Sequence, residues 1–274
     1  MIINTNVPAL NAWRNLELQN TTLNSSLQKL SSGKRINTAA DDASGLAISE
    51  KMNGQINGLN QASSNAQGAI SLIQTAEGAL NETTSIIQRL RQLAVQSRNS
   101  TETNSDRQQT NKEVTQLIAE IGRIATTTQF NGKTLLNGSA STTSLVFQIG
   151  ANTGQTIKVQ IANAKQTATG VGLTGVSMNT ASGASNAISL LDKALSKVST
   201  SRANLGAVQN RLQHTVNNLN VASENLTSAK SQIVDVDMAK EMASFTKTQI
   251  LVQAGTAMLA QANQAPQAVL KLLG

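Results

Sequence analysis

Residues 188–219 read ISLLDKALSKVSTSRANLGAVQNRLQHTVNNL. Apolar side chains recur here at alternating steps of three and four, which is typical of a long helix that buries one stripe against another helix. The positions of this heptad seam, which continues to residue 233, are Ile188, Leu191, Leu195, Val198, Arg202, Leu205, Gln209, Leu212, Val216, Leu219, Ser223, Leu226, Lys230 and Ile233. The stretch therefore predicts a helix that needs a partner of similar length.

A second long run supplies that partner. It starts after Asp42, a candidate N-cap, and lasts to about Arg98, which corresponds to roughly 85 Å of helix. Its seam positions are Met52, Ile56, Leu59, Ser63, Ala66, Ile70, Ile73, Glu77, Leu80, Ile87 and Leu90. We expect this helix and the 188–233 helix to pair antiparallel along one rod.

Both ends of the chain carry shorter seams. The first helix should stop near Gly33, and Pro266 should loosen or end the last one. The apolar positions expected to form polymerisation seams are Trp13, Leu16, Leu23, Leu27, Leu30, Met238, Met242, Phe245, Val252 and Leu259. Because two terminal helices share only one face, we expect residues 1–35 and 235–274 to be largely disordered in the monomer and to fold on assembly.

The middle of the chain predicts the only β structure. A helix over about 105–128 precedes the turn dipeptides Asn131-Gly132 and Asn137-Gly138, and residues 144–161 alternate with period two, as in a hairpin. The sequence thus predicts a mainly α protein: a long antiparallel helical bundle or coiled-coil rod, with a small β-hairpin region (about 129–180) at one end and paired terminal helices at the other. The expected domains are 1–40 plus 234–274 (terminal) and 41–233 (rod).

Composition argues against an enzyme. The chain has no cysteine and one histidine, His214, so it cannot build a multi-histidine or thiolate metal site. The acidic pairs Asp41-Asp42 and Asp235/Asp237 are better explained as helix-start signals than as acid–base groups. We predict no catalytic residue, cofactor or metal, and no membrane partner. The net charge of +7 is scattered, which disfavours nucleic acid but leaves a basic coiled-coil nucleic-acid binder as an alternative.

Several motifs resemble bacterial flagellin. They are INTNVPALNAWRNL, LSSGKRINTAADDASGLAISEKM, SLIQTAEGALNE, QRLRQLAVQ (88–96) and TQFNGKTLLNG (128–138), together with the run from LGAVQNRLQHTVNNLNVASENL to QAPQAVLKLL. The resemblance covers about 1–165 and 184–273 and implies a subunit that polymerises into the flagellar filament for motility. A hook–filament junction protein, which shares the N-terminal signature, is the alternative. The large outer domains common in the family are absent.

The resemblance implies further properties. The terminal segments would line the inner tube of the filament, and the chain would leave the cell through flagellar type III export to the extracellular flagellum. An export chaperone, the cap and the junction proteins would be partners. The Toll-like receptor 5 epitope of the family maps to Arg89, Leu93 and Glu113, although Gln92 replaces the usual glutamate of that motif.

Overall fold

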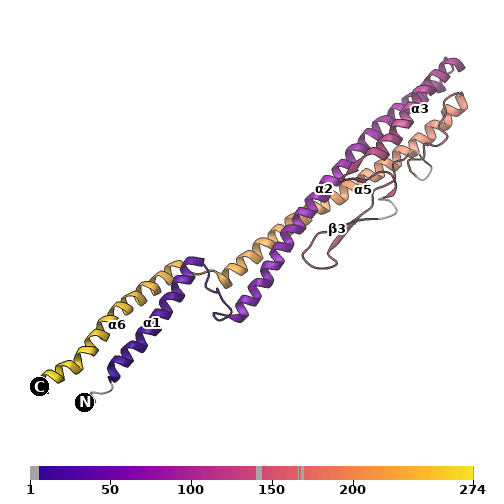
Figure 1. Cartoon of the computed structure of the whole chain (residues 1–274). Coiled ribbons are helices and arrows are strands. Elements are labelled where there is room, and N and C mark those ends of the chain that lie inside the picture. The colour runs from indigo at the N-terminus through magenta and orange to yellow at the C-terminus, as the bar shows by residue number, and fades with distance from the viewer. Residues whose placement is uncertain (1–5, 140–143, 166, 168–169, 274) are drawn as a thin grey trace. The chain divides into compact units, whose positions relative to one another are not determined.

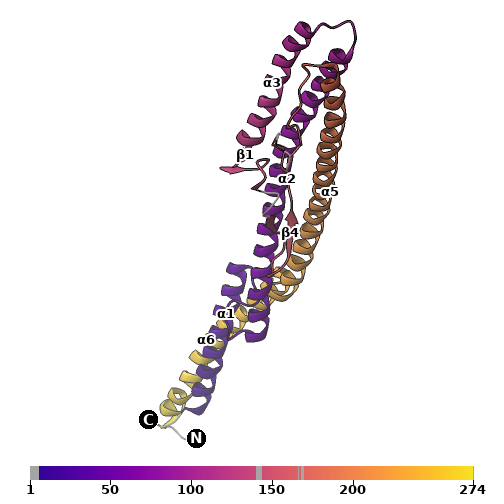
Figure 2. The same cartoon turned by 90° about the vertical axis from the view of Figure 1, so that its right-hand side faces the viewer.

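The computed structural model describes residues 6–139, 144–165, 167 and 170–273. It divides into two compact units: unit 1 comprises residues 1–55 and 224–274, and unit 2 comprises residues 56–223. The elements, all but β2 labelled in Figure 1 or Figure 2, are α1 (Val7–Ser32), α2 (Ala43–Arg98), α3 (Asn104–Thr127), β1 (Gln129–Phe130), β2 (Lys133–Thr134), β3 (Leu145–Gln148), β4 (Thr156–Val159), α5 (Ala181–Val234) and α6 (Met238–Leu273). The predicted mainly α class is confirmed.

In unit 1, α1 and α6 lie side by side and antiparallel (Figures 1 and 2). The Asn6 amide donates to the carbonyl of Ala262 at 2.8 Å near one end of the pair. At the other end, Lys34 and Asp235 form an isolated antiparallel β-bridge. The less exposed faces of the two helices are lined by Ala9, Ala12, Leu16, Gln19, Leu23 and Ser26, and by Phe245, Thr248, Val252, Gly255, Leu259 and Ala262.

The ends of these helices follow the sequence signals with one exception. Helix α1 ends at Ser32 because Gly33 adopts the left-handed conformation (φ 69°) that glycine accepts without strain. Of the two effects expected of Pro266, loosening or ending the last helix, ending does not occur, because α6 runs on to Leu273. The helix continues because proline removes only one backbone N–H, and the alanine, glutamine and leucine residues that flank it are strong helix formers.

One member of each predicted acidic pair serves as a helix-start group, whereas Asp41 binds the turn before α2 and Asp235 accepts the hydroxyl of Ser231 near the end of α5. Asp42 accepts the backbone N–H of Gly45 at 2.9 Å and caps α2, and Asp237 accepts those of Ala239 and Lys240 at the start of α6. The backbone N–H of Thr38, followed by that of Asn37, holds the pKa of Asp41 below its ordinary value. These carboxylates are engaged with backbone or hydroxyl donors and are not arranged for proton transfer.

In unit 2, α2 and α5 pack antiparallel, so the expected partnership is confirmed. The residue numbers of the contacting partners increase along α2 and decrease along α5: Ser63 contacts Asn220 at 3.2 Å, Glu77 contacts Arg202 at 3.7 Å, and Arg91 contacts Asp192 at 2.8 Å. The largest fully buried side chains are Ile73, Leu80, Ile87, Leu90, Ile121, Leu135, Leu136, Ile161, Leu173, Met178, Leu191 and Leu205. Aliphatic side chains therefore fill this core.

Helix α3 folds back beside α2 in unit 2 (Figure 2). Its N-terminus carries a capping box, in which Thr103 and Asp106 satisfy each other's backbone N–H groups. The hydroxyl and N–H of Thr103 lower the pKa of Asp106. The Arg107 side chain, 9% exposed, donates to the carbonyls of Ser97 and Asn99 at 2.8 and 3.0 Å, so it holds the turn that reverses the chain.

Two antiparallel hairpins follow α3. The first turns at Asn131 and Gly132, both at positive φ (49° and 75°), as the Asn-Gly pair predicted. The second pairs β3 with β4, with Phe147 opposite Ile157, and confirms the period-two pattern. Residues 140–143, within the region predicted as hairpin, lie outside the described residues.

The second hairpin lies beside the helices of unit 2 rather than beyond their ends, where we expected it. The Asn65 amide of α2 donates to the carbonyl of Gln148 at 3.2 Å. A Cβ at Gly58 would come within 2.8 Å of the Ala151 side chain, so glycine allows this close approach. The position differs because α3 carries the chain back along α2 before the hairpin begins.

Candidate assembly surface

Exposed apolar side chains concentrate on the terminal helices. Ten of the fourteen exposed large hydrophobic residues in the described part of the chain belong to α1 or α6. They are Val7, Leu10, Trp13, Leu18, Leu27, Met238, Met242, Ile250, Leu251 and Met258. In addition, residues 248–270 carry no charged side chain. Apolar surface on this scale is typical of a protein–protein contact.

The ten predicted seam residues divide into two groups. Leu16, Leu23, Leu30, Phe245, Val252 and Leu259 are half-buried. Trp13 and Leu27 are instead 55% and 46% exposed, and Met238 and Met242 are 49% and 47% exposed. The contact face of α1 uses the small or polar residues Ala12, Gln19 and Ser26 where the sequence pattern favoured larger apolar neighbours.

The helical geometry places the exposed group on one flank of the pair. At about 100° per residue, Trp13 and Leu27 lie about 100° and 60° to one side of Ala12. Relative to Val252, Met242 and Met238 are rotated in the same sense by about 80° and 40°. Because α1 and α6 run antiparallel, rotation in the same sense leads to the same flank. We call this the Trp13 flank.

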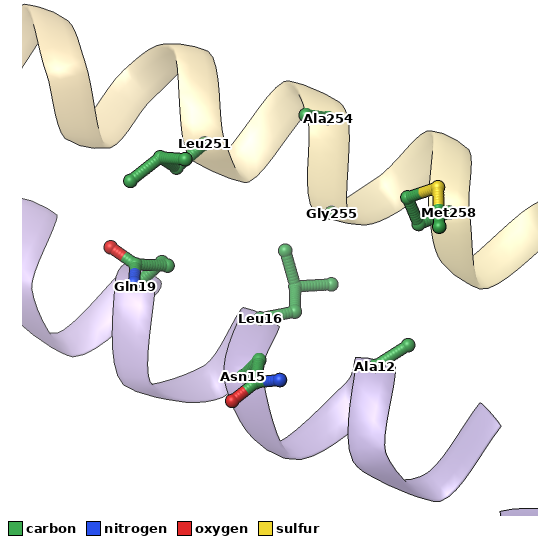
Figure 3. Close-up of a pocket in the computed structure, with 8 residues that line it drawn as sticks. All are labelled: Ala12, Asn15, Leu16, Gln19, Leu251, Ala254, Gly255 and Met258. Carbon is green, nitrogen blue, oxygen red and sulfur yellow. The ribbon is translucent and has the colours of Figure 1, made fainter. Parts of the chain in front are cut away.

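The opposite flank is hollowed. A groove of about 380 Å³ lies there, and Figure 3 shows that its walls come from both helices. It is lined by Ala12, Asn15, Leu16, Gln19, Leu251, Ala254, Gly255 and Met258. At Gly255 an added Cβ would meet Leu16 at 3.2 Å, so glycine lets the two helices approach closely. We call this side the groove flank.

The three residues predicted as a receptor epitope occupy different environments in unit 2. Arg89 of α2 donates through Nε and Nη2 to one carboxylate oxygen of Glu113 of α3, at 3.1 and 2.9 Å, and both side chains are about half exposed. Leu93 is 3% exposed and belongs to the core cluster. The surface at this place is therefore an ion pair across two helices, and Gln92 is exposed next to it.

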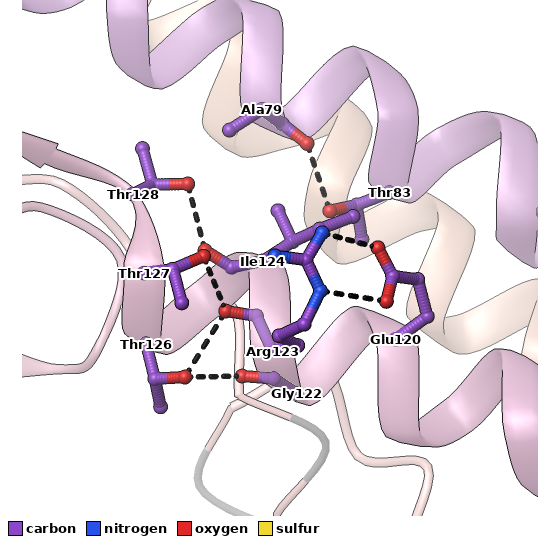
Figure 4. Close-up of polar contacts among 9 residues, drawn as sticks. All are labelled: Ala79, Thr83, Glu120, Gly122, Arg123, Ile124, Thr126, Thr127 and Thr128. Carbon is purple, nitrogen blue, oxygen red and sulfur yellow. Dashed lines mark hydrogen bonds and ion pairs between the residues drawn. The ribbon is translucent and has the colours of Figure 1, made fainter.

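The described residues hold no group of three or more histidine, cysteine, aspartate or glutamate side chains able to bind a metal ion. His214 is exposed on α5. Near the end of α3, Arg123 pairs with both carboxylate oxygens of Glu120 and lowers its pKa, while threonine hydroxyls donate to helix carbonyls (Figure 4). These polar groups satisfy one another and the helix backbone.

No helix in the described part of the chain is both long and apolar enough to cross a lipid bilayer. The apolar surface of α1 and α6 is instead divided between a contact within the pair and two flanks. Sequence periodicity detected its side chains but could not separate these roles.

Comparison with known proteins identifies the family. Residues 3–141 match the bacterial flagellin N-terminal helical region, and residues 188–273 match the bacterial flagellin C-terminal helical region. The flagellin of Halalkalibacterium halodurans is 54% identical over 273 residues, and that of Bacillus subtilis is 49% identical over 303 residues. The flagellar filament 33 kDa core protein of Treponema phagedenis is 52% identical over 285 residues. Each match covers the whole of both chains.

Solved structures agree. Bacillus cereus flagellin has a TM-score of 0.50 at 33% identity, and the match covers 57% of this chain and 88% of the chain in that structure. A putative flagellar hook-associated protein from Vibrio parahaemolyticus has a TM-score of 0.61 over 71% of this chain, but at 13% identity the likeness concerns the fold alone. The full-length relatives favour the filament over the junction alternative and over a nucleic-acid binder. The chain belongs to the bacterial flagellins and is a structural subunit of the extracellular flagellar filament, not an enzyme.

Proposed function

We propose that copies of this flagellin assemble through the exposed apolar surface of α1 and α6, and that residues 1–40 and 234–274 form the inner-tube domain, with residues 41–233 as the rod around it. The observation that carries the proposal is the concentration of exposed large apolar side chains on these two helices. Fully burying an exposed apolar side chain releases about 1.5–3 kcal/mol. The ten side chains are 41–64% exposed, so covering their remaining surface still favours contact with copies.

The stability of α1 and α6 is expected to depend on assembly. In one subunit, α1 and α6 share a single contact face, half-buried even at its leucines. Such a pair recovers little of the conformational entropy that ordering its residues costs. Neighbouring subunits would cover the remaining faces. The N-terminal residues 1–5 and Gly274, at the ends of the segments concerned, lie outside the described residues.

Hydrogen exchange tests this coupling between folding and assembly. In the monomer, amides of α1 and α6 should exchange nearly as fast as in an unfolded chain, and in filaments they should become strongly protected. Amides of unit 2 around Leu90, which is fully buried, serve as the internal control because they should be protected in both states. Strong protection of α1 and α6 in the monomer would contradict the proposal.

The export chaperone, the cap and the junction proteins are proposed as further partners. An apolar helix surface that waits for its assembly partners needs cover to avoid aggregation. The uncharged 248–270 segment of α6 suits a chaperone that binds the C-terminal helix during type III export. The cap and the junction proteins would contact the same terminal helices at the two ends of the growing polymer.

We also propose that Arg89, Leu93 and Glu113 contribute to recognition by host Toll-like receptor 5. The exposed ion pair between Arg89 and Glu113 supports this assignment, because it presents paired charges from two helices on one surface. Leu93, 3% exposed, would contribute by holding α2 in the core beneath that pair. Gln92 leaves the surface with one negative charge fewer than the usual motif.

Replacing Arg89 and Glu113 together with alanine should weaken receptor signalling by monomeric protein, since two polar contacts with a partner would be lost. A reporter cell line that expresses the receptor measures the effect as a shift of the dose–response curve. The matched control is the Glu120→Ala, Arg123→Ala double variant, because this pair on α3 is similarly exposed. Equal signalling by the two double variants would refute the epitope.

A further inference from the structure

We infer that Trp13 of one subunit inserts into the groove between α1 and α6 of a neighbouring subunit. This inference rests on the proposed assembly through the terminal helices and adds to it a specific pair of complementary surfaces. The groove is lined by Ala12, Asn15, Leu16, Gln19, Leu251, Ala254, Gly255 and Met258. Its occupant would be a second copy of this chain.

Size and chemistry make Trp13 the matching side chain. The groove measures about 380 Å³, within the range of roughly 300–1,000 Å³ typical of pockets that hold a bound group. Figure 3 shows Leu16 projecting from α1 into the space below Gly255, with Leu251 and Met258 on the α6 side. Trp13 is the only tryptophan of the chain and is 55% exposed. Large aromatic side chains that fill such pockets dominate the energetics of interfaces.

The positions of the charged side chains also favour insertion of Trp13 into the groove. The two ionisable side chains of α1 closest to the groove in sequence are Arg14 and Glu17, which lie about 200° and 140° around the helix from Ala12. Both therefore point away from the groove. On α6, the segment that lines it is uncharged. Insertion of the indole itself would therefore place no ion in the groove, and Glu17, one helical turn after Trp13 on the inserting helix, would lie at the edge of the contact.

The placement of the two surfaces gives the geometry of the contact. Trp13 and the groove lie at the same level along the pair, since both involve residues 12–19 of α1, but on opposite flanks. A projection on one flank that fits a hollow on the other makes a head-to-tail contact, which each added copy can repeat. This is the type of contact that an open polymer requires, and a two-fold dimer would leave it unused.

Tryptophan fluorescence tests the inference directly, because the chain has one tryptophan and no tyrosine. When wild-type monomer is added to filament seeds, the emission should shift to shorter wavelength and quenching by acrylamide should be largely lost. Filaments whose Trp13 remains as quenchable as in the monomer would overturn the inference while leaving the proposed assembly intact. Failure of the seeded wild-type protein to polymerise would overturn both.

A double-mutant cycle locates the partner of Trp13. Trp13→Ala and Ala254→Phe should each raise the critical concentration for assembly by roughly tenfold or more, the first by removing the projection and the second by filling the groove. The double variant should recover much of this loss, because the phenylalanine fills the space that the indole leaves.

The cycle is informative because Trp13 and Ala254 lie on opposite flanks of one subunit, so coupling between them can arise only between copies. Far-UV circular dichroism of each variant, assembled above its critical concentration, checks that α1 and α6 form as in the wild type, because these helices are expected to fold only on assembly. Additive effects of the two substitutions on the critical concentration would overturn the inference.

Discussion

A variant that carries glutamate at both Leu27 and Met242 should fold like the wild type and fail to extend filaments. Both side chains are about half exposed on the Trp13 flank, so carboxylates there remain hydrated in the monomer. In a filament they would be transferred into an apolar contact, and an unpaired buried charge costs several kcal/mol. Because each 1.4 kcal/mol changes an equilibrium constant tenfold, the critical concentration should rise beyond the reach of an ordinary assay.

Sedimentation and electron microscopy after seeding measure this loss, and the midpoint of thermal unfolding checks the monomer. The control exchanges the same two positions for apolar residues of similar volume, Leu27→Met and Met242→Leu, and should assemble normally. If the glutamate variant grows filaments like this control, the Trp13 flank does not take part in polymerisation.

Replacing Leu90 with alanine should destabilise unit 2 by about 2–5 kcal/mol. The side chain is fully buried in the core cluster of unit 2. Its removal loses the transfer free energy of three carbon atoms and leaves a cavity that long, regular helices cannot easily close. Urea unfolding monitored by circular dichroism should show a lower midpoint with an unchanged slope, since the surface exposed on unfolding is almost the same.

Val95→Ala is the matched control for Leu90→Ala. Val95 lies on the same helix but is 52% exposed, so its truncation should change the free energy of unfolding by no more than about 0.5 kcal/mol. Equal effects of the two substitutions would mean that the α2 face assigned to the core does not stabilise unit 2.

Hydrophobic periodicity predicted the long helices because it reports directly on which face is buried. The buried positions Ile73, Leu80 and Leu90 of α2, and Leu191 and Leu205 of α5, all belong to the predicted seams. The helix boundaries near Gly33, Asp42 and Arg98 were equally predictable, because caps and glycines act locally.

Hydrophobic periodicity could not distinguish the contact face of each terminal helix from its exposed faces. Trp13 and Leu27 are large and apolar, whereas the face that α1 presents to α6 uses Ala12 and Ser26. Periodicity ranks side chains by apolar character, so it cannot tell a stripe that pairs within one chain from a stripe left for a second copy. That distinction depends on how closely the backbones of α1 and α6 approach each other. Gly255 allows the close approach because it has no side chain to meet Leu16 of α1.

Tertiary features were also missed where the chain reverses. The position of the β3–β4 hairpin follows from the length and direction of α3, and no local pattern encodes that direction. Leu93, placed by resemblance between two surface charges, is buried because it is rotated by about 40° from Arg89 around α2, toward the core residues Leu90 and Ala94. The hydrogen bonds from Arg107 to the carbonyls of Ser97 and Asn99 could not be predicted from hydrophobic periodicity, because they depend on a single polar side chain.

The antiparallel pairing of α2 with α5 has a kinetic consequence. Ser63 finds its partner at Asn220 and Glu77 at Arg202, so the contacts that close the core join segments far apart in the sequence. Loop-closure entropy must be lost before such contacts form, and folding slows as contact order rises. The first half of a nascent chain cannot complete this core until the ribosome has made most of the second half. The subunit should therefore remain without its complete core during most of its synthesis.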